Sequence, residues 1–427
     1  MNARTLAACV AIVLAAPITR AAAQIPFRLL SIDEAVNEAI GHNPALTAQR
    51  ATLAVADAAL VTASLRPNPV LTGDIDSLDL VGTGFSEQNN AGPPQAAVRV
   101  DVPLERGRKR ALRSAVARYG REFAGAQVAD ASRRLKLDVT LACVDVLEAK
   151  ARLALGRDNL QTLERLVDLN ERRVATGAIA PLEVTRSRVA MLQYRASVRT
   201  AALALTQARL KLLPLLGVRA GDAPVDIDDR LGLAVQPAAP NLDVLQEAAR
   251  AARPDLRAGR TDQARTQADL RLQVAQAAVD YTVGAEFRRQ QGIAGRGNML
   301  GFFVSVPLPF FNRNQGEIAR AEAERRRSVL ALTAVESDVS AEVASAFEEF
   351  RSSQQLVAEI ERDLLQPAND ARAGTTYTYQ AGATSLLDVL DAQRAFNDTM
   401  DNYYAAQAAY RRAHARLTLV AGDEVIR

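Results

Sequence analysis

The chain carries one structural plan twice, and this duplication restricts its fold more than any other feature of the sequence. Residues 100–104, with the sequence Val-Asp-Val-Pro-Leu, return at 304–308 as Val-Ser-Val-Pro-Leu. Gly177 and Gly382 correspond in the same way. A period of roughly 200 residues far exceeds that of a solenoid repeat, so the sequence indicates a duplicated domain.

Each copy contains a helical segment far longer than those of ordinary globular proteins. No proline occurs between Pro103 and Pro181, so residues 104–176 can form one nearly continuous helix of roughly 100 Å, at about 1.5 Å per residue. In the second copy, Pro367 lies within the corresponding segment and predicts a kink there.

The segments that follow Gly177 and Gly382 show the heptad spacing of coiled-coil seams. The two glycines therefore predict the turns of two antiparallel helical hairpins. The seam positions are Val184, Met191, Val198, Leu205 and Leu212 in the first copy and Val389, Phe396, Tyr403, Tyr410 and Leu417 in the second.

Four shorter segments alternate between apolar and polar residues, which is the period of a β-strand with one apolar face. We expect two β-hairpins, at residues 68–104 and 279–308, with connections at 82–94 and 292–297. The clearest apolar faces consist of Ala96, Val98, Val100 and Val102 and of Val279, Tyr281, Val283, Ala285 and Phe287.

The first residues have the pattern of a secretory signal peptide, with Arg4 before an apolar run and small residues before Gln24, the expected mature start. The apolar run follows Cys9 instead of preceding it, which argues against lipidation of that cysteine. The mature chain then keeps one thiol, Cys143, and cannot form an intrachain disulfide. No later apolar run is long enough for a transmembrane helix, so a membrane span would have to be a β-barrel.

These patterns divide the chain into four parts. The linker between the copies is polar, with Asp226, Asp228 and Asp229. The parts are a signal peptide at 1–23, a first repeat at 24–217, the linker at 218–240 and a second repeat at 241–427.

The charged residues and histidines exclude several classes of function. The 52 basic and 49 acidic residues are mixed along the chain, which disfavours a nucleic-acid partner. His42 and His414 are the only histidines and have no metal-ligand spacing. We find no catalytic constellation and no phosphate loop, so we expect neither an enzyme nor a bound cofactor or metal.

One dense basic cluster follows the first predicted hairpin. We expect it at a membrane rim or in the solvated first turns of the long helix. Phe310 and Phe311 have the equivalent place in the second copy, which is consistent with an interfacial aromatic belt. The cluster consists of Arg106, Arg108, Lys109, Arg110 and Arg113.

Strands of roughly ten residues with one apolar and one polar face match those of outer-membrane barrels, although a soluble sandwich has similar strands. Four strands cannot close a barrel, because the smallest known barrels have about eight. A barrel would therefore have to be shared between chains.

Three motifs make the whole mature chain similar to the outer-membrane efflux protein family, the TolC-like channels. The stretch 307–316 and the turn at 177–184 most resemble the heavy-metal cation efflux branch of this family, the CzcC or CusC type. The motifs are Val-Pro-Leu-Pro-Phe-Phe-Asn-Arg-Asn-Gln-Gly at 306–316, Tyr-Gln-Ala-Gly at 379–382 with Leu-Asp-Val-Leu-Asp-Ala at 387–392, and Gly-Ala-Ile-Ala-Pro-Leu-Glu-Val at 177–184.

The resemblance implies an α+β membrane protein that forms a homotrimeric channel in the outer membrane. Four strands per chain would form a shared twelve-stranded β-barrel in outer-membrane lipid, and the long helices would continue it as an α-barrel into the periplasm. The channel would be passive. It would dock a periplasmic adaptor (membrane fusion) protein and an inner-membrane resistance-nodulation-division (RND) pump.

The resemblance also assigns candidate site residues. Asp388 and Asp391 match the aspartates that ring the closed periplasmic end, Tyr379 matches the tyrosine of the constriction, and Glu183 has the place of an acidic partner. Thr384 stands where some members have a basic residue, so a salt-bridge latch is in doubt. A ring of carboxylates favours cations. Solvated helix polarity is the alternative for the two aspartates.

Two further sets of residues follow from the same comparison. Gly177 and Gly382 are expected to form the turns that dock the adaptor. The expected junction between strand and helix comprises Pro103, Pro307, Pro309, Asn312, Arg313, Asn314 and Gly316.

Other functions remain open at this stage. A TolC-like channel can also serve drug efflux or type I secretion. A periplasmic coiled-coil adaptor or scaffold would explain the heptads and the signal peptide, but it leaves the paired strands unexplained. A secreted hydrolase lacks a visible nucleophile and base.

Overall fold

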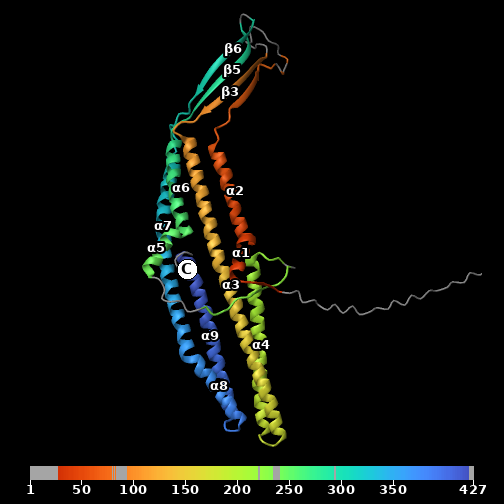
Figure 1. The fold of residues 1–427 in the computed structure, drawn as a ribbon. Coiled ribbons are helices and arrows are strands. Elements are labelled where there is room, and N and C mark those ends of the chain that lie inside the picture. Colours follow the sequence, from red (N-terminus) through yellow and green to blue (C-terminus); the bar gives the residue numbers. More distant parts are fainter. Residues whose placement is uncertain are drawn as a thin grey trace, which may run out of the picture.

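The structure, a computed structural model, describes residues 27–78, 80, 82, 94–219, 222–233, 241–292 and 295–422. The predicted signal peptide lies outside these residues, as do most of the connection at 82–94 and part of that at 292–297. The described chain is elongated, with a β-sheet at one end and two helical tips at the other (Figure 1).

The elements follow the same order in both copies. The first copy contains β1 (Arg28–Leu30), α1 (Ile32–His42), α2 (Pro44–Ser64), β2 (Val70–Asp76), β3 (Gln95–Leu104), α3 (Lys109–Ala175) and α4 (Pro181–Leu216), followed by β4 (Val225–Ile227). The second contains α5 (Leu242–Ala252), α6 (Pro254–Gln276), β5 (Tyr281–Gly292), β6 (Gly295–Ser305), α7 (Gln315–Glu359), the π-helical turn η1 (Ile360–Leu364), α8 (Leu365–Gln380) and α9 (Leu386–Ala421).

The long helices confirm the prediction made from the spacing of the prolines. Helix α3 runs without interruption for 67 residues. In the second copy the corresponding helix is interrupted at η1, just before Pro367. Proline has no N–H to donate to the carbonyl four residues earlier, so a local break of the helical hydrogen bonding is expected there. The predicted kink thus has a structural counterpart in this π-helical turn.

Most residues of the heptad seams are buried, as the spacing predicts, and Met191, Val198 and Tyr403 are partly buried. Leu212 on α4 and Tyr410 and Leu417 on α9 are almost fully inaccessible. They belong to two apolar clusters at mid-length of the molecule, one among α1, α3 and α4 and one among α5, α7 and α9. Cys143 lies within the first cluster, where burial raises the pKa of its thiol to about 12.

The two predicted hairpins are present and join into one sheet, with the strand order β2-β3-β5-β6. All neighbouring strands are antiparallel, and β3 pairs with β5, so that Val98 lies opposite Phe287 and Arg99 opposite Glu286. Strands β2 and β6 each keep one unpaired edge among the described residues. These edges are free to pair with another chain.

The two faces of the sheet differ in the way the alternation predicts. On the apolar face, Phe302 is 79% exposed, and Val98 and Val304 are exposed as well. On the other face, Ala97 and Glu286 are buried, and Arg99 donates two hydrogen bonds of 2.9 and 2.8 Å to Asp101. The polar face is therefore internally paired, and the apolar face has no partner within the described chain.

The segment expected to be a polar linker contains a strand instead. Residues of β4 are buried and pair in parallel with β1 near the start of the chain. Asp226 of this strand accepts hydrogen bonds from Arg209, and Lys150 lies 2.9 Å away. Strands of three residues give too short an alternation to be recognised in a sequence, so β4 was not predicted within the linker.

None of the helices in the described part of the chain is long and apolar enough to cross a membrane.

Candidate functional site

The helical tips lie at the end of the molecule farthest from the sheet (Figure 1). Gly177 and Gly382 adopt φ values of +73° and +80° in the turns that join α3 to α4 and α8 to α9. This left-handed conformation suits glycine, so the prediction of two tight turns is confirmed. No described atom lies within 4 Å of the position a Cβ would take at either glycine, so both turns face open space.

Asp388 lies in the first turn of α9, where it completes a capping box with Ser385. Ser385 Oγ donates to the Asp388 carboxylate at 2.7 Å, and the Ser385 backbone N–H donates to it at 3.0 Å. These hydrogen bonds lower the pKa of Asp388 below its usual value. The aspartate is therefore charged at neutral pH and also holds the start of the helix.

Asp391 and Glu183 are each followed by an arginine three residues later. Asp391 pairs with Arg394 at 3.2 Å, and Glu183 pairs with Arg186 at 3.4 Å. The structure places the two aspartates in the first two turns of α9 and Glu183 in the first turn of α4. The charge of Glu183 acts on the phenol of Tyr379, whose pKa is raised first by burial and further by this charge.

Tyr379 links the two hairpins within the chain. Its side chain is buried at the end of α8, and its hydroxyl donates a 2.8 Å hydrogen bond to Asn170 Oδ1 on α3. Arg173 donates to the Tyr379 carbonyl at 3.1 Å, and its guanidinium lies 5.3 Å from the tyrosine ring centroid. Burial raises the pKa of the Tyr379 phenol, so it remains a neutral hydrogen-bond donor.

Thr384 takes no part in this contact between hairpins. Its hydroxyl lies 3.1 Å from that of Thr378, within the turn that Gly382 forms. The cation nearest to the Tyr379 backbone is supplied instead by Arg173 of the first copy. This arginine and Asn170 were missed by the sequence analysis.

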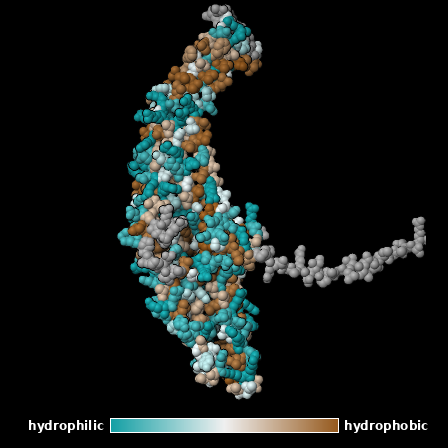
Figure 2. Space-filling view, viewed as in Figure 1, coloured by the Kyte–Doolittle hydropathy of each residue, from teal (hydrophilic) through white to brown (hydrophobic). Residues whose placement is uncertain are grey.

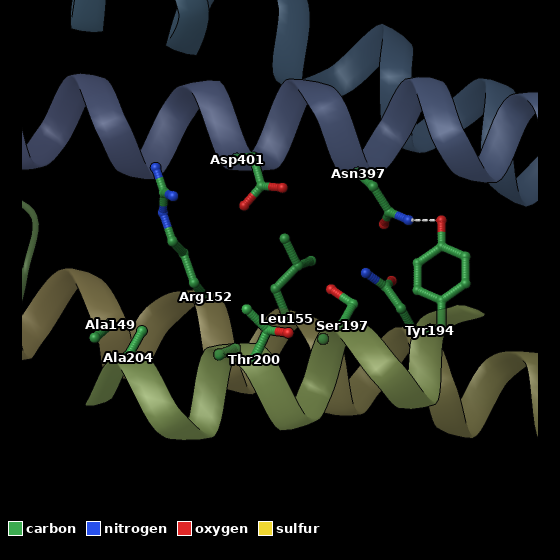
Figure 3. A pocket seen from close by; sticks show the side chains of 12 residues that line it. Ala149, Arg152, Leu155, Tyr194, Ser197, Thr200, Ala204, Asn397 and Asp401 are labelled. Atoms are coloured by element: carbon green, nitrogen blue, oxygen red, sulfur yellow. Dashed lines mark hydrogen bonds between the residues drawn. The ribbon is translucent and has the colours of Figure 1, made fainter. Parts of the chain in front are cut away.

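A second layer of polar contacts joins the hairpins nearer to the middle of the molecule. Gln393 on α9 donates to Asn159 on α3 at 3.0 Å and to Asn397 at 3.3 Å. Asn397 in turn donates to the hydroxyl of Tyr194 on α4 (Figure 3). Gln393 and Asn397 are four residues apart on an inward face of α9, a pattern that could have revealed this layer.

A cavity of about 250 Å³ adjoins this layer between α3, α4 and α9. Arg152 and Asp401 flank it, and Tyr194 and Asn397 close one end (Figure 3). Burial raises the pKa of the Asp401 carboxyl, while the nearby Arg152 opposes this shift. Polar contacts therefore join the hairpins at this level, while nearer to the tips an apolar cluster that includes Leu163, Leu386 and Val389 joins them as well.

The junction between the second hairpin and α7 is ordered by its own asparagines. Asn314 adopts φ +62° before α7 and donates a 2.7 Å hydrogen bond to the Gln273 carbonyl at the end of α6. Asn312 accepts from the Asn314 backbone N–H at 2.9 Å. Among the other predicted junction residues, Pro103 ends β3, whereas Pro307 and Pro309 follow β6 and Arg313 and Gly316 flank the start of α7.

The sequence profile of the family described as "Outer membrane efflux protein" matches residues 35–218 and again residues 245–423. The chain belongs to this family. The two matches cover most of the chain, and each covers one copy of the duplicated plan.

Individual relatives agree with this assignment. The cobalt-zinc-cadmium resistance protein CzcC of Cupriavidus metallidurans is 27% identical over 365 residues, which cover 86% of this chain and 83% of CzcC. The pyoverdine export outer membrane protein OpmQ of Pseudomonas aeruginosa is 26% identical over 403 residues, which cover 89% of this chain and 76% of OpmQ.

Solved structures share the fold. CusC superimposes with a TM-score of 0.75 at 19% identity, covering 93% of both chains. The outer-membrane channel OprN superimposes with a TM-score of 0.76 at 20% identity, covering 100% of this chain and 99% of OprN. The chain therefore has the TolC-like channel fold, as the sequence motifs predict.

The family assignment fixes the class of function. The protein is an outer-membrane efflux channel that extends into the periplasm, and members of its family are trimeric outer-membrane components of tripartite efflux systems. Such channels are passive conduits and not enzymes. In the described residues, no group of three or more histidine, cysteine or acidic side chains could hold a metal ion.

Proposed function

We propose that this channel exports heavy-metal cations, as the outer-membrane part of a system driven by an RND-type pump. The observation that carries the proposal is the similarity to CzcC over 86% of the chain, together with the fold shared with CusC. The channel supplies no energy, so the pump and a periplasmic adaptor select and drive the cargo.

In the proposed assembly, three chains pair their β2 and β6 edges to close a twelve-stranded barrel in outer-membrane lipid. The unpaired edges and the exposed apolar face of the sheet support this arrangement. The repeats at 24–217 and 241–427 then contribute alternate helical hairpins to the periplasmic tunnel, and the turns at Gly177 and Gly382 dock the adaptor.

The proposed gate lies at the tips. Threefold symmetry repeats Asp388 and Asp391 as a ring of carboxylates, which attracts cations at the narrow end of the tunnel. The low pKa of Asp388 supports this role, because its charge persists in weakly acidic conditions. Tyr379 holds the closed position through Asn170, and Glu183 contributes negative charge from the neighbouring hairpin.

The test compares a deletion strain with the parent strain for growth in zinc, cobalt, cadmium, copper and silver, and in hydrophobic drugs. We expect sensitivity to one or more of the metals that the intact gene restores, and no change in drug sensitivity. A strain with normal metal tolerance and raised drug sensitivity contradicts the proposal.

A small organic cargo is the second candidate. OpmQ, a pyoverdine export protein by name, is nearly as similar to this chain as CzcC. The same growth comparison separates the two, because this candidate predicts drug sensitivity or a loss of a secreted small molecule with normal metal tolerance.

A further inference from the structure

The apolar face of the sheet ends abruptly where the strands meet the helices. Figure 2 shows hydrophobic side chains gathered over the sheet and hydrophilic ones directly below it, over the upper ends of the helices. The boundary coincides with the junctions before β2, after β3, before β5 and after β6. An outer-membrane protein has such a boundary where lipid tails give way to headgroups.

Large apolar side chains project from the loops at this boundary. Phe310 is 71% exposed and Phe311 is 93% exposed in the segment between β6 and α7. Leu65, in the loop before β2, and Leu104, the last residue of β3, are exposed as well. Aromatic side chains that are this exposed in the described chain, placed beside an apolar sheet face, fit the interfacial layer of a bilayer.

Exposed cations surround these apolar residues. They lie where the strands meet the helices, in the connecting loops or, for Arg110, in the first turn of α3, and none forms an ion pair with an acidic side chain among the described residues. Arg106 donates a hydrogen bond to the Tyr281 hydroxyl and keeps its charge. The two nearby acidic residues are already paired, Asp280 with Lys109 at 2.7 Å and Glu105 with Arg113. The unpaired cations are Arg66, Arg106, Arg108, Arg110 and Arg313; we refer to them as the basic collar.

A groove lies where the sheet meets the helices, between the segment that joins β6 to α7 and the segment that joins α6 to β5. It has a volume of about 520 Å³ and is lined by Phe311, Asn312 and Arg313 on one side and by Lys109 and Asp280 on the other. Lys109 donates to the Ala278 carbonyl at 2.6 Å as well as to Asp280, so its charge is compensated within the chain. Among the residues that line the groove, Arg313 of the collar is the cation without an acidic partner in the described chain.

We propose that the basic collar binds the headgroups of anionic phospholipids in the membrane leaflet that faces the helices. Phe310 and Phe311 enter the acyl region just above, and the collar arginines contact the phosphates. Zwitterionic phospholipids carry their own ammonium group beside the phosphate, so unpaired arginines favour lipids with net negative charge. Continuity with the exposed apolar face of the sheet favours a lipid over a protein partner at this site.

The chain offers a clean probe, because it contains no tryptophan. The variant Phe311→Trp places a single fluorophore at an exposed position of the boundary. The full-length protein is reconstituted in phosphatidylethanolamine vesicles that contain equal amounts of phosphatidylglycerol and phosphatidylcholine, only one of which is brominated. We expect the brominated anionic lipid to quench the emission with an apparent affinity roughly threefold or more above that of the zwitterionic lipid.

Whether the collar causes the preference for the anionic lipid is tested by removing collar charges in the Phe311→Trp protein. The triple variant Arg108→Gln/Arg110→Gln/Arg313→Gln is expected to equalise the two lipids. The matched control Arg199→Gln/Arg257→Gln/Arg327→Gln removes three exposed arginines that also lack an acidic partner among the described residues, but lie on helices α4, α6 and α7. It is expected to leave the lipid preference intact.

Three results overturn the proposal. Equal quenching by the two lipids in the Phe311→Trp protein means an unselective lipid contact. No quenching by either lipid means that the loop lies in water, where it is available to a protein partner. An equal loss of preference in the control triple means that overall charge, and not the collar, attracts the lipid. Heat-resistant trimers on gels verify that each variant is assembled.

Discussion

The two helix-ending glycines Gly177 and Gly217 provide a controlled test of how the packing at mid-length differs from that at the tips. Both have φ +73°, so alanine meets the same backbone strain at both positions. At Gly177 an added Cβ would meet no described atom within 4 Å. At Gly217, which ends α4, it would lie 2.4 Å from the His42 carbonyl oxygen and 2.9 Å from the His42 carbonyl carbon.

The expected magnitudes follow from these distances. A left-handed conformation costs an alanine about 1–2 kcal/mol relative to glycine, and a lower entropy of the unfolded chain offsets part of this in both variants. In Gly217→Ala the close atoms belong to the backbone between α1 and α2 and cannot rotate away. Forced displacement of packed structure adds about 1–3 kcal/mol. We therefore expect Gly177→Ala to cost about 1 kcal/mol per chain and Gly217→Ala to cost clearly more.

The assay is unfolding of the detergent-solubilised protein in guanidinium chloride, followed by far-ultraviolet circular dichroism. Where unfolding is irreversible, the temperature at which trimers dissociate on gels replaces it. Gly382→Ala, at φ +80° in open space, serves as a second control and should resemble Gly177→Ala. Equal destabilisation by Gly177→Ala and Gly217→Ala would show that backbone strain alone determines the cost, and would refute the packing argument.

Three further predictions concern the gate. Tyr379→Phe removes a buried hydrogen bond worth about 1 kcal/mol and leaves the Asn170 side chain unpaired. Reconstituted channels of this variant should therefore open more often. In a double-mutant cycle, Asn170→Ala should add little to the effect of Tyr379→Phe, and additive effects would contradict the link between the two side chains. Asp388→Ala with Asp391→Ala should weaken cation selectivity measured from reversal potentials. In the unaltered channel the part of this selectivity that Asp388 contributes should be lost at a lower pH than an ordinary aspartate would give, because hydrogen bonds from Ser385 depress its pKa and the charge is lost only as pH falls through that lowered value. Unchanged ion selectivity of the double variant argues against the ring. Pro367→Ala restores an N–H to the helix and should reduce channel opening by stiffening the π-helical turn, whereas unchanged gating would mean that the turn is not a hinge.

Long-range regularities in the sequence were sufficient for most of the fold. Heptads and proline spacing predict the hairpins because many residues contribute to each pattern. The pairing of β1 with β4 could not be predicted in this way, since each strand has three residues and its partner lies far along the chain. The join between β3 and β5 likewise depends on tertiary packing.

The candidate site was only partly accessible to sequence reasoning. Its aspartates and glycines could be located by their similarity to family motifs, and the glycines were correctly assigned to turns, but the helix-capping role of Asp388 was missed. Asp388 caps helix α9 together with Ser385. A serine followed three residues later by an acidic residue is the pattern of a capping box, so the sequence did contain a signal for this role. The partner of Tyr379, Asn170, comes from the other copy and is visible only once the hairpins are packed together.

The unbroken α3 and the interrupted α7–η1–α8 segment give the two halves of the chain different mechanics. A continuous helix of 67 residues behaves as a stiff strut that fixes the distance between the sheet and its tip. The interrupted helix contains its π-helical turn after 45 residues of α7 and before 16 residues of α8, closer to the tip than to the sheet. After the duplication, the π-helical turn in the second copy was enough to make the two copies mechanically different. The first copy then keeps the length of the molecule through α3, and the second can bend at η1.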